Sequence, residues 1–264
     1  MNLNLVDVHC HLDHELFKND LAETLQRART AGVKVIITSG VNPAANRIAL
    51  ELADKYKPLV KCALGLYPID ALGLEPDESG LASSGTFDVD EELAFIAKNK
   101  DKIAAVGEAG LDYKVVNDPV LIKKQQENFK KIIALCEKIK KPLIIHSRKA
   151  EKDCIDILET SKLKKVNLHC FEGNKNLIKR ATDLGYSFSI PTHIVRLQHF
   201  QTLGATVPID HLLTETDAPW LTPFPGKRNE PAHVLETIKK IAEIKGFTID
   251  ETANSIFMNY QRMF

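Results

Sequence analysis

Long apolar runs, paired cysteines and an excess of charge of either sign are all missing from this 264-residue sequence. No apolar run approaches the roughly 18 residues that a membrane-crossing helix needs, so we expect no membrane-spanning segment. The first residues read as a strand rather than as the start of a signal peptide, which predicts a cytoplasmic protein. The five cysteines are an odd number without Cys-x-x-Cys spacing, which argues against a disulfide framework and agrees with a reducing compartment.

The charge balance argues against one class of nucleic-acid-binding protein. Lysine plus arginine and aspartate plus glutamate each number 35, so the net charge is zero. A protein that coats duplex DNA usually carries a basic face, which these totals do not indicate. The lysine-rich stretches at 123–124, 138–141 and 162–165 are interpreted as solvated helix ends. A small cluster of basic residues around the opening of an active site is still compatible with a net charge of zero.

Short apolar segments alternate with longer amphipathic ones along the whole chain. The short segments are rich in Val, Ile, Leu and Ala without clean two-residue alternation, which is typical of parallel strands buried on both faces. We expect eight such strands, at residues 5–11, 33–39, 60–66, 103–110, 142–147, 166–171, 186–190 and 211–216.

Helical patterns fill the intervals between these strands. Over residues 119–140 the apolar positions recur near helical spacing, and Asp118-Pro119 supplies an N-cap followed by proline at the first helical position. Alternating strands and helices predict a parallel α/β sheet, and eight repeats predict its closure into a TIM-like (β/α)8 barrel. An open doubly wound sheet is the alternative, but no glycine-rich phosphate fingerprint follows the first strand.

No linker divides the chain, so residues 1–264 are predicted to form a single barrel domain. Residues 231–245 and 250–264 are expected to form two terminal helices. The one long irregular stretch, residues 69–87, is rich in glycine, serine, aspartate and proline. Because it follows the third strand, we expect it to form a rim over an active site, with a surface insertion as the alternative.

Residue types that bind metals fall at the carboxyl ends of the predicted strands, where barrel active sites are built. His9 and His11 are two residues apart at the end of the first strand, so both imidazoles point to the same side. The remaining candidates end the fourth, fifth, sixth and eighth strands, and they are Glu108, His146, His169 and Asp217.

Each of these residues alone has an ordinary structural explanation, because histidines cap strand ends and acidic residues beside glycine serve turns. Together they would bury several charged groups without partners, which is costly, whereas a metal centre satisfies all of them. Four imidazoles and two carboxylates suit Zn²⁺, Mn²⁺, Fe²⁺ or Ni²⁺, with Mg²⁺ also a candidate. Six ligands exceed a closed zinc site and indicate two ions about 3.5–4 Å apart that share a carboxylate and activate water for hydrolysis.

With these residues assembled, the sequence resembles the TatD family of metal-dependent deoxyribonucleases over nearly the whole chain. The segments that carry the resemblance are DVHCHLD at 7–13, GEAGLDY at 107–113, PLIIHSR at 142–148, NLHCF at 167–171, ETDAPWL at 215–221 and GKRNEP at 226–231. The resemblance implies an amidohydrolase-related barrel that holds two divalent metal ions. It also implies cleavage of DNA phosphodiesters, with single strands trimmed from the 3′ end.

The same resemblance implies a role for each ligand. One ion would be held by His9, His11 and Asp217. The other would be held by His146 and His169, with Glu108 bridging the two. Asp217 would also take the proton from the attacking water, so that Asp217 and Glu108 are the expected catalytic residues.

Other residues are candidates for the substrate side of the site. Arg148 lies at the mouth of the fifth strand, and Lys227 and Arg228 lie in the loop after the last strand. All three are expected to contact phosphate, for which arginine has the matching planar geometry. Trp220, the one tryptophan, is a candidate for stacking on a base, with packing against the barrel rim as the alternative.

The sequence departs from the family pattern at Tyr67, where GLYP at 65–68 replaces the GLHP of many members. Tyr67 is therefore a further candidate for contacting substrate, because tyrosine can donate a hydrogen bond there but cannot shuttle a proton near neutral pH as histidine can. His193, just beyond the seventh strand, is a candidate substitute, with a free surface histidine as the alternative. Asp13 and Asp112 are candidates for orienting imidazoles, with helix capping as the alternative.

The sequence supports three functional hypotheses. The first is a divalent-metal-dependent deoxyribonuclease whose partner is DNA, and the second is a metal-dependent hydrolase of another ester or amide, such as a deacylase or lactonase, on the same dinuclear barrel. The basic residues Arg148, Lys227 and Arg228 favour phosphate, whereas the neutral charge and Tyr67 favour a smaller substrate. A non-catalytic scaffold is the third, and the complete ligand set argues against it.

Overall fold

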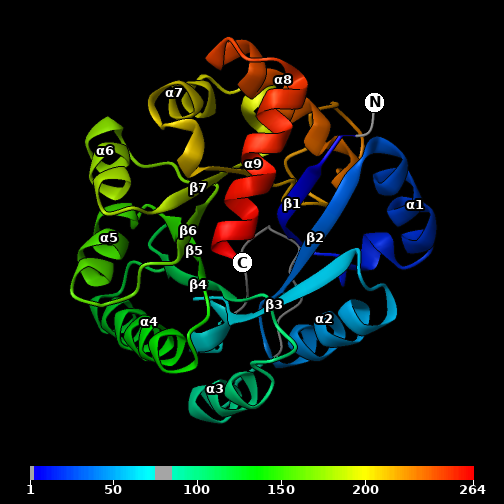
Figure 1. The fold of residues 1–264 in the computed structure, drawn as a ribbon. Helices are drawn as coiled ribbons and strands as arrows, with labels where there is room; N and C mark the ends of the chain where they lie inside the picture. The colour runs from blue at the N-terminus through cyan, green and yellow to red at the C-terminus, as the bar shows by residue number, and fades with distance from the viewer. Residues whose placement is uncertain (1–2, 75–84) are drawn as a thin grey trace.

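The computed structural model describes residues 3–74 and 85–264, and its strands form one parallel sheet (Figure 1). The eight strands pair in chain order, each with the next. They are β1 (Leu5–Cys10), β2 (Val33–Gly40), β3 (Val60–Leu66), β4 (Ala105–Asp112), β5 (Leu143–Arg148), β6 (Val166–His169), β7 (Ser187–Ile190) and β8 (Leu212–Thr214). Because helices cover the outside of the sheet, nearly every strand residue is buried, as the apolar composition of the strands predicts.

Backbone hydrogen bonds between the end of β1 and the segment after β8 close the sheet into a barrel. The amide of Asp217 donates to the carbonyl of His9 at 2.9 Å, and the amide of His11 donates to the carbonyl of Ala218 at 2.8 Å. The predicted TIM-like (β/α)8 barrel is therefore confirmed, and the open doubly wound alternative is wrong. This seam also brings the histidine pair of β1 beside Asp217.

A buried aspartate fastens the same seam from inside. Asp7 is fully buried, and its carboxyl group accepts hydrogen bonds from the amide of Thr216 at 2.9 Å and from the Thr216 hydroxyl at 2.5 Å. Burial raises the pKa of Asp7 to about 8, although both of these hydrogen bonds act in the opposite direction. Upstream, the Thr214 hydroxyl donates to the carbonyl of Val6 at 2.7 Å, so polar side chains complete the closure where strand pairing ends.

Helices surround the barrel in a ring, as Figure 1 shows. They are α1 (Leu21–Ala31), α2 (Pro43–Lys55), α3 (Val89–Lys98), α4 (Pro119–Ile139), α5 (Glu151–Glu159), α6 (Lys175–Asp183), α7 (Gln198–Thr206), α8 (Val234–Lys245) and α9 (Ile249–Met263). Short 3-10 helices cover Glu15–Phe17, Asp70–Leu72, Thr192–Val195, Ile209–His211 and Pro231–His233. Within the described ranges, every helix is too short or too polar to cross a membrane.

The start of α4 illustrates how local sequence sets helix boundaries. The Asp118 carboxylate accepts hydrogen bonds from the amides of Val120 at 2.9 Å and Leu121 at 3.0 Å, and Pro119 occupies the first turn. The predicted N-cap is therefore confirmed. The helix ends at Ile139 because Lys140 adopts a left-handed conformation with φ 57°.

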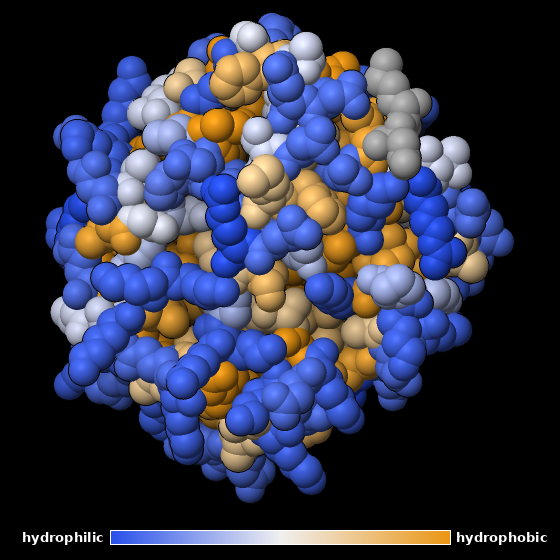
Figure 2. Space-filling view, viewed as in Figure 1, coloured by the Kyte–Doolittle hydropathy of each residue, from blue (hydrophilic) through white to orange (hydrophobic). Residues whose placement is uncertain are grey.

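Helix α9 lies across the end of the barrel at which the strands begin, in front of the sheet in Figure 1. The side-chain amide of Asn259 donates to the carbonyls of Ile209 at 2.7 Å and Leu212 at 2.8 Å, which ties α9 to the start of β8. Figure 2 shows this same end covered mostly by hydrophilic side chains, with smaller apolar areas between them. We call it the amino-terminal end, and the opposite end, where the strands finish, the carboxyl-terminal end.

Strand β4 lies further along the chain than predicted, at 105–112 instead of 103–110. Its pairing with β3 begins only at Ala105, and its last residue, Asp112, still pairs with Arg148 of β5. The chain then turns because the Asp112 carboxylate accepts the amides of Lys114 at 2.9 Å and Val115 at 3.2 Å. Glu108 therefore lies in the middle of β4 rather than at its end, a correction to the expected position.

Several other predicted boundaries also shift. Strand β8 is shorter than the expected 211–216, because the chain beyond Thr214 bonds to β1 through isolated contacts rather than a ladder. The expected helix at 231–245 begins with the 3-10 turn Pro231–His233 before α8. The irregular stretch 69–87 contains the 3-10 turn Asp70–Leu72, and residues 75–84 lie outside the described residues, so the rim hypothesis remains a prediction.

Candidate metal centre

The predicted ligand side chains meet at the carboxyl-terminal end of the barrel. They come from β1, β4, β5 and β6 and from the segments that follow β1 and β8, and they are His9, His11, Glu108, His146, His169 and Asp217. Their side chains are between 0% and 16% exposed. Residues separated by more than 200 positions thus share one largely buried site.

Glu108 stands at the centre of this cluster, and its two carboxylate oxygens face different imidazoles. Oε2 lies 3.4 Å from Nε2 of His9 and 3.5 Å from Nε2 of His11. Oε1 lies 2.8 Å from Nδ1 of His146 and 3.1 Å from Nε2 of His169. A carboxylate that presents one oxygen to each of two imidazole pairs has the geometry of a bridging ligand.

Asp217 supplies a second carboxylate to the pair from β1. Its Oδ1 lies 3.5 Å from Nε2 of His9 and 3.4 Å from Nε2 of His11. The backbone of Asp217 has φ 53°, a left-handed conformation that is uncommon outside glycine. The hydrogen bond from its backbone amide to the carbonyl of His9 holds this conformation. The closure of the barrel therefore directs the carboxylate toward the histidine pair.

The donor atoms fall into three overlapping groups, each with all its ligand atoms within 4.8 Å of one another. These groups are His9, His11 and Glu108; Glu108, His146 and His169; and His9, His169 and Asp217. Nitrogen and carboxylate oxygen donors in this mixture suit divalent transition metals. Moreover, Nε2 of His9 is fully buried and has no hydrogen-bond partner among the described residues. A metal ion would satisfy this nitrogen, so the residues fit the group that the sequence predicts.

In two of the imidazoles, the ring nitrogen that faces away from Glu108 lies close to a polar side chain. Nδ1 of His9 lies 3.1 Å from the Ser39 hydroxyl, and Nε2 of His146 lies 3.1 Å from Oδ2 of Asp112. The hydroxyl of Tyr67 donates to the same Asp112 oxygen at 3.2 Å. Asp112 thus contacts one of the candidate imidazoles, and its orienting role stays a prediction. In each case the other ring nitrogen faces Glu108.

Glu215, which was not predicted as a site residue, lies beside a third imidazole, that of His169. It is fully buried, and its Oε1 lies 3.6 Å from Nδ1 of His169 and accepts the amide of Cys170 at 2.8 Å. The Ser189 hydroxyl donates to its other oxygen. The sequence places Glu215 only two residues before Asp217, but strand alternation does not relate the two side chains, because β8 ends at Thr214 and Asp217 has φ 53°.

Burial and the neighbouring histidines have opposite effects on the pKa values of the two carboxyl groups in the site. Burial is the largest influence on Glu108 and favours its neutral form, but His169, His146 and His9 outweigh it and hold its pKa well below the usual value. Burial likewise opposes ionisation of Asp217, whose pKa is nevertheless lowered, by His11 above all. Both carboxyl groups are therefore anionic at neutral pH, as metal ligands must be.

The cluster opens into a cavity of about 520 Å³ at the carboxyl-terminal end. Three of the residues predicted to contact substrate line this cavity, namely Tyr67, Arg148 and Trp220. The Trp220 ring lies 5.1 Å from the His11 ring and 5.3 Å from the His14 ring, edge to face in both cases. Trp220 therefore packs against His11, one of the candidate ligands, as well as facing the cavity.

Arg228 and Lys227 do not line the cavity. The Arg228 guanidinium makes two hydrogen bonds with Asp20, at 2.7 and 2.8 Å, and lies 4.4 Å above the Phe17 ring. The ammonium of Lys227 lies 5.9 Å from the Phe224 ring. The structure thus places Arg228 in an ion pair that joins its loop to the segment before α1. His193, the candidate substitute for the family histidine, does not line the cavity either.

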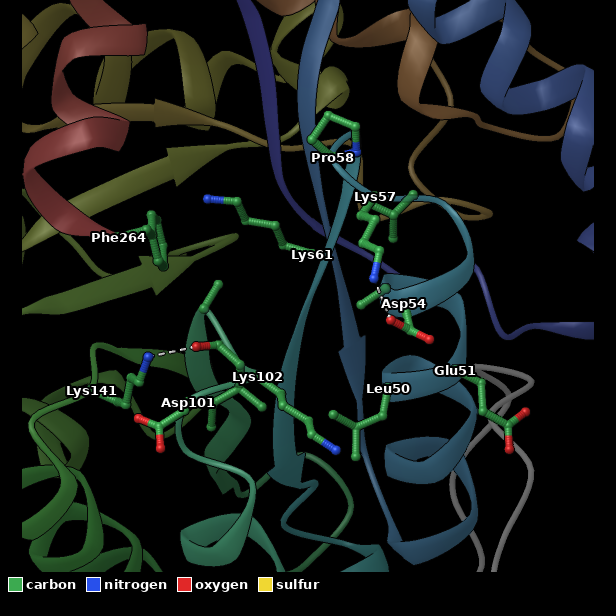
Figure 3. Close-up of a pocket in the computed structure, with 14 residues that line it drawn as sticks. Leu50, Glu51, Asp54, Lys57, Pro58, Lys61, Asp101, Lys102, Lys141 and Phe264 are labelled. Carbon is green, nitrogen blue, oxygen red and sulfur yellow. Dashed lines mark hydrogen bonds and ion pairs between the residues drawn. The ribbon is translucent and has the colours of Figure 1, made fainter.

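A second cavity, of about 760 Å³, lies at the amino-terminal end between α2, α9 and the starts of β3 and β4 (Figure 3). Its polar residues interact locally, as the dashed lines in Figure 3 indicate. The Lys57 ammonium pairs with Asp54 at 2.8 Å, and the Lys141 ammonium donates to the carbonyl of Ile103 at 2.7 Å. In the part of the chain that the structure describes, the ligand-type clusters lie elsewhere, at the carboxyl-terminal end.

Comparison with known proteins relates this geometry to a family. The chain is 32% identical to the putative deoxyribonuclease TATDN3 of Mus musculus, over 100% of this chain and 89% of that protein. It is 33% identical to the uncharacterized metal-dependent hydrolase YabD of Bacillus subtilis, over 98% of both. The crystal structure of the TatD homolog YJJV from Escherichia coli superposes with a TM-score of 0.86 at 29% identity, covering 100% of this chain and 99% of that one. The family model described as TatD related DNase matches residues 6–264, and the chain therefore belongs to this family.

Proposed function

We propose that this protein is a divalent-metal-dependent hydrolase that cleaves DNA phosphodiester bonds at the carboxyl-terminal end of the barrel. The observation that carries the proposal is the position of Glu108, whose two oxygens face two separate imidazole pairs. Relatives named as deoxyribonucleases support DNA as the substrate.

In this proposal the chain holds two divalent ions. His9, His11 and Asp217 would hold one, His146 and His169 the other, and Glu108 would bridge them. Bound there, the ions supply Lewis acidity, lowering the pKa of a coordinated water and offsetting charge on the phosphate oxygens. Zn²⁺, Mn²⁺, Ni²⁺ and Mg²⁺ are all candidates, because the donor set alone admits each of them.

Asp217 is the proposed proton acceptor. Its carboxylate faces the cavity and is ionised at neutral pH, because neighbouring histidines keep its pKa low. The bond from its amide to His9 limits its movement, so it can take a proton from the attacking water without reorganising. Arg148, which lines the same cavity, is the proposed partner of a phosphate oxygen.

We further propose that the substrate enters as the 3′ end of a single strand. The cavity of about 520 Å³ lies in the size range of small-ligand sites, which suits one terminal nucleotide better than an uninterrupted duplex. Trp220 would then stack on the terminal base from the cavity wall. Lys227 and Arg228 are retained as contacts for the more distant strand, with Arg228 acting only if its pair with Asp20 opens.

A smaller ester or amide is the second candidate substrate, and Tyr67 favours it. The Tyr67 hydroxyl donates to Asp112 at 3.2 Å instead of offering an imidazole to a leaving group. An ester whose leaving group departs without a proton near neutral pH would suit such a site, whereas the amine released from an amide would need its proton from another group. We also propose that residues 1–264 form one functional unit, since all eight strands share one sheet. The free state of all five cysteines agrees with a cytoplasmic location.

The test is cleavage of a single-stranded DNA oligonucleotide labelled at its 5′ end, with Mg²⁺ or Mn²⁺ and with chelator. We expect stepwise shortening by the wild type, and its loss with chelator and in His146→Ala. His211→Ala is the matched control, because His211 contacts the Tyr186 carbonyl outside the site. Absence of cleavage by a protein that binds two equivalents of metal would reject the nuclease and favour the ester or amide hydrolase.

A further inference from the structure

Two lysines that the sequence analysis did not single out line the cavity at the carboxyl-terminal end, Lys114 and Lys149. Lys114 follows the end of β4 and Lys149 follows the end of β5. These strands are neighbours, with Asp112 paired to Arg148 in register and the amide of Tyr113 donating to the carbonyl of Arg148 at 2.9 Å. The two lysines therefore leave adjacent strand ends on one wall of the cavity.

Carboxylates hold the backbone of this wall at both lysines, and one of them, Asp112, also contacts the metal centre. The amide of Lys114 donates to the Asp112 carboxylate at 2.9 Å, and that carboxylate also contacts His146. Lys149 adopts φ 60°, a left-handed conformation, and its amide donates to the Glu151 carboxylate at 3.2 Å. A non-glycine residue keeps such a conformation only where its surroundings enforce it, and this one lies beside a functional cavity.

The charge on this wall is not balanced locally. In the described ranges no carboxylate lies within 4.0 Å of the Lys114 or Lys149 ammonium, whereas Arg148 lies 3.9 Å from Asp112. The acidic side chains that line the cavity are Glu108, Glu172 and Asp217. Glu108 and Asp217 belong to the metal centre, which leaves Glu172 as the one carboxylate of the lining that could oppose the lysines.

We propose that Lys114 and Lys149 form a second anion subsite, which binds the phosphate adjacent to the scissile phosphate of a nucleic-acid strand. The inference rests on the proposed function, because the metal centre would engage one phosphate and the next would reach the rim. Every nucleotide of a strand carries one negative charge, so a strand has such a second phosphate and an isolated phosphodiester does not. Lysine acts as a point charge on a flexible stem, which suits a backbone phosphate whose position varies.

The binding test uses the Asp217→Asn protein loaded with Mn²⁺ and a fluorescein-labelled oligothymidylate, followed by fluorescence anisotropy at several salt concentrations. We expect Lys114→Ala/Lys149→Ala to weaken binding about fivefold to tenfold and to reduce the slope of log K against log salt by roughly 0.7, for the one phosphate contact that is lost. Lys114→Arg/Lys149→Arg should restore both. The matched control is Lys61→Ala/Lys102→Ala, which removes the same charge from the amino-terminal cavity and should stay within about twofold.

The turnover test compares oligothymidylate with bis(p-nitrophenyl) phosphate, which has a single phosphodiester. In the otherwise wild-type background, Lys114→Ala/Lys149→Ala should lower kcat/KM for oligothymidylate relative to kcat/KM for bis(p-nitrophenyl) phosphate at least about fivefold. Equal binding and equal salt slopes in the two double alanine variants would overturn the subsite. Weaker binding with an unchanged slope would also overturn it, because no phosphate contact would have been lost. A wild type that hydrolyses neither substrate, yet binds the oligonucleotide through these lysines, would reject the proposed function and leave the subsite standing.

Discussion

The two ends of the barrel each carry a cavity, and the larger cavity is not the one lined by the candidate metal centre. The amino-terminal cavity is larger, at about 760 Å³ against 520 Å³. Its charged side chains are mostly exposed, and Lys57 pairs with Asp54, three residues before it in the sequence. At the carboxyl-terminal end, buried imidazoles and carboxylates from distant strands converge. Convergence of buried polar groups, which would be costly without a ligand, therefore locates function better than volume does.

Backbone conformation separates the two ends in the same way. Four of the cavity-lining residues at the carboxyl-terminal end have left-handed φ values although they are not glycine: Lys149 at 60°, Cys170 at 44°, Asp217 at 53° and Leu221 at 53°. Among the described residues, the lining of the amino-terminal cavity includes none. Such conformations cost about 1–3 kcal/mol each and persist where tertiary contacts impose them.

The largest expected effect comes from removing the bridge. Glu108→Gln should lose at least one bound ion, because an amide cannot offer an anionic oxygen to both imidazole pairs, and activity should fall about a thousandfold or more. Elemental analysis of the purified protein and the DNA cleavage assay measure the two effects. Asp54→Asn, at the amino-terminal cavity, is the control and should retain both. Two full metal equivalents in Glu108→Gln would contradict the bridging role.

A smaller effect is expected from Glu215→Gln. The neutral amide would support the Nδ1 proton of His169 less well than the carboxylate, so metal affinity should fall about tenfold to a hundredfold. Isothermal titration with Mn²⁺ or Zn²⁺ gives this affinity without relying on turnover. Glu92→Gln is the matched control, because Glu92 is also buried but pairs with Arg47 and Asn46. Equal affinities in the two variants would mean that Glu215 serves the fold alone.

Tyr67→Phe should have a modest effect, a loss of about twofold to tenfold in kcat/KM, which corresponds to one hydrogen bond to a group that positions His146. Tyr113→Phe is the comparison, because the Tyr113 hydroxyl donates to Asp153 and does not line the cavity. Steady-state kinetics on the oligonucleotide measure both. A loss above a hundredfold would indicate that Tyr67 touches the reacting atoms.

The smallest effect is expected at the amino-terminal end. Lys57→Ala should change the free energy of unfolding by less than about 1 kcal/mol, because its pair with Asp54 is exposed, and should leave turnover within about twofold. Urea denaturation and the cleavage assay check these two values. A large loss of turnover would break the comparison, since it would show that the amino-terminal cavity communicates with the metal centre.

Local sequence was sufficient to predict the strands and the residues that gather at the candidate metal centre. Buried parallel strands have a recognisable composition, and His9 and His11 share one side because strand side chains alternate. A barrel of parallel strands also sends every carboxyl end to the same face, so residues at those ends could be grouped before any contact was known. The position of Glu108 within β4 was misjudged by the same reasoning, because strand ends depend on pairing partners.

The sequence by itself therefore determined the barrel, the donor types and the face on which they gather. Only the tertiary structure decided which oxygen of Glu108 faces which imidazole pair, that Glu215 lies 3.6 Å from Nδ1 of His169, and that Arg228 pairs with Asp20 instead of lining the cavity. The physical reason is that composition and periodicity are local properties of the chain. Contacts between side chains on different strands depend instead on register and on closure of the sheet, which are set only when all eight strands assemble.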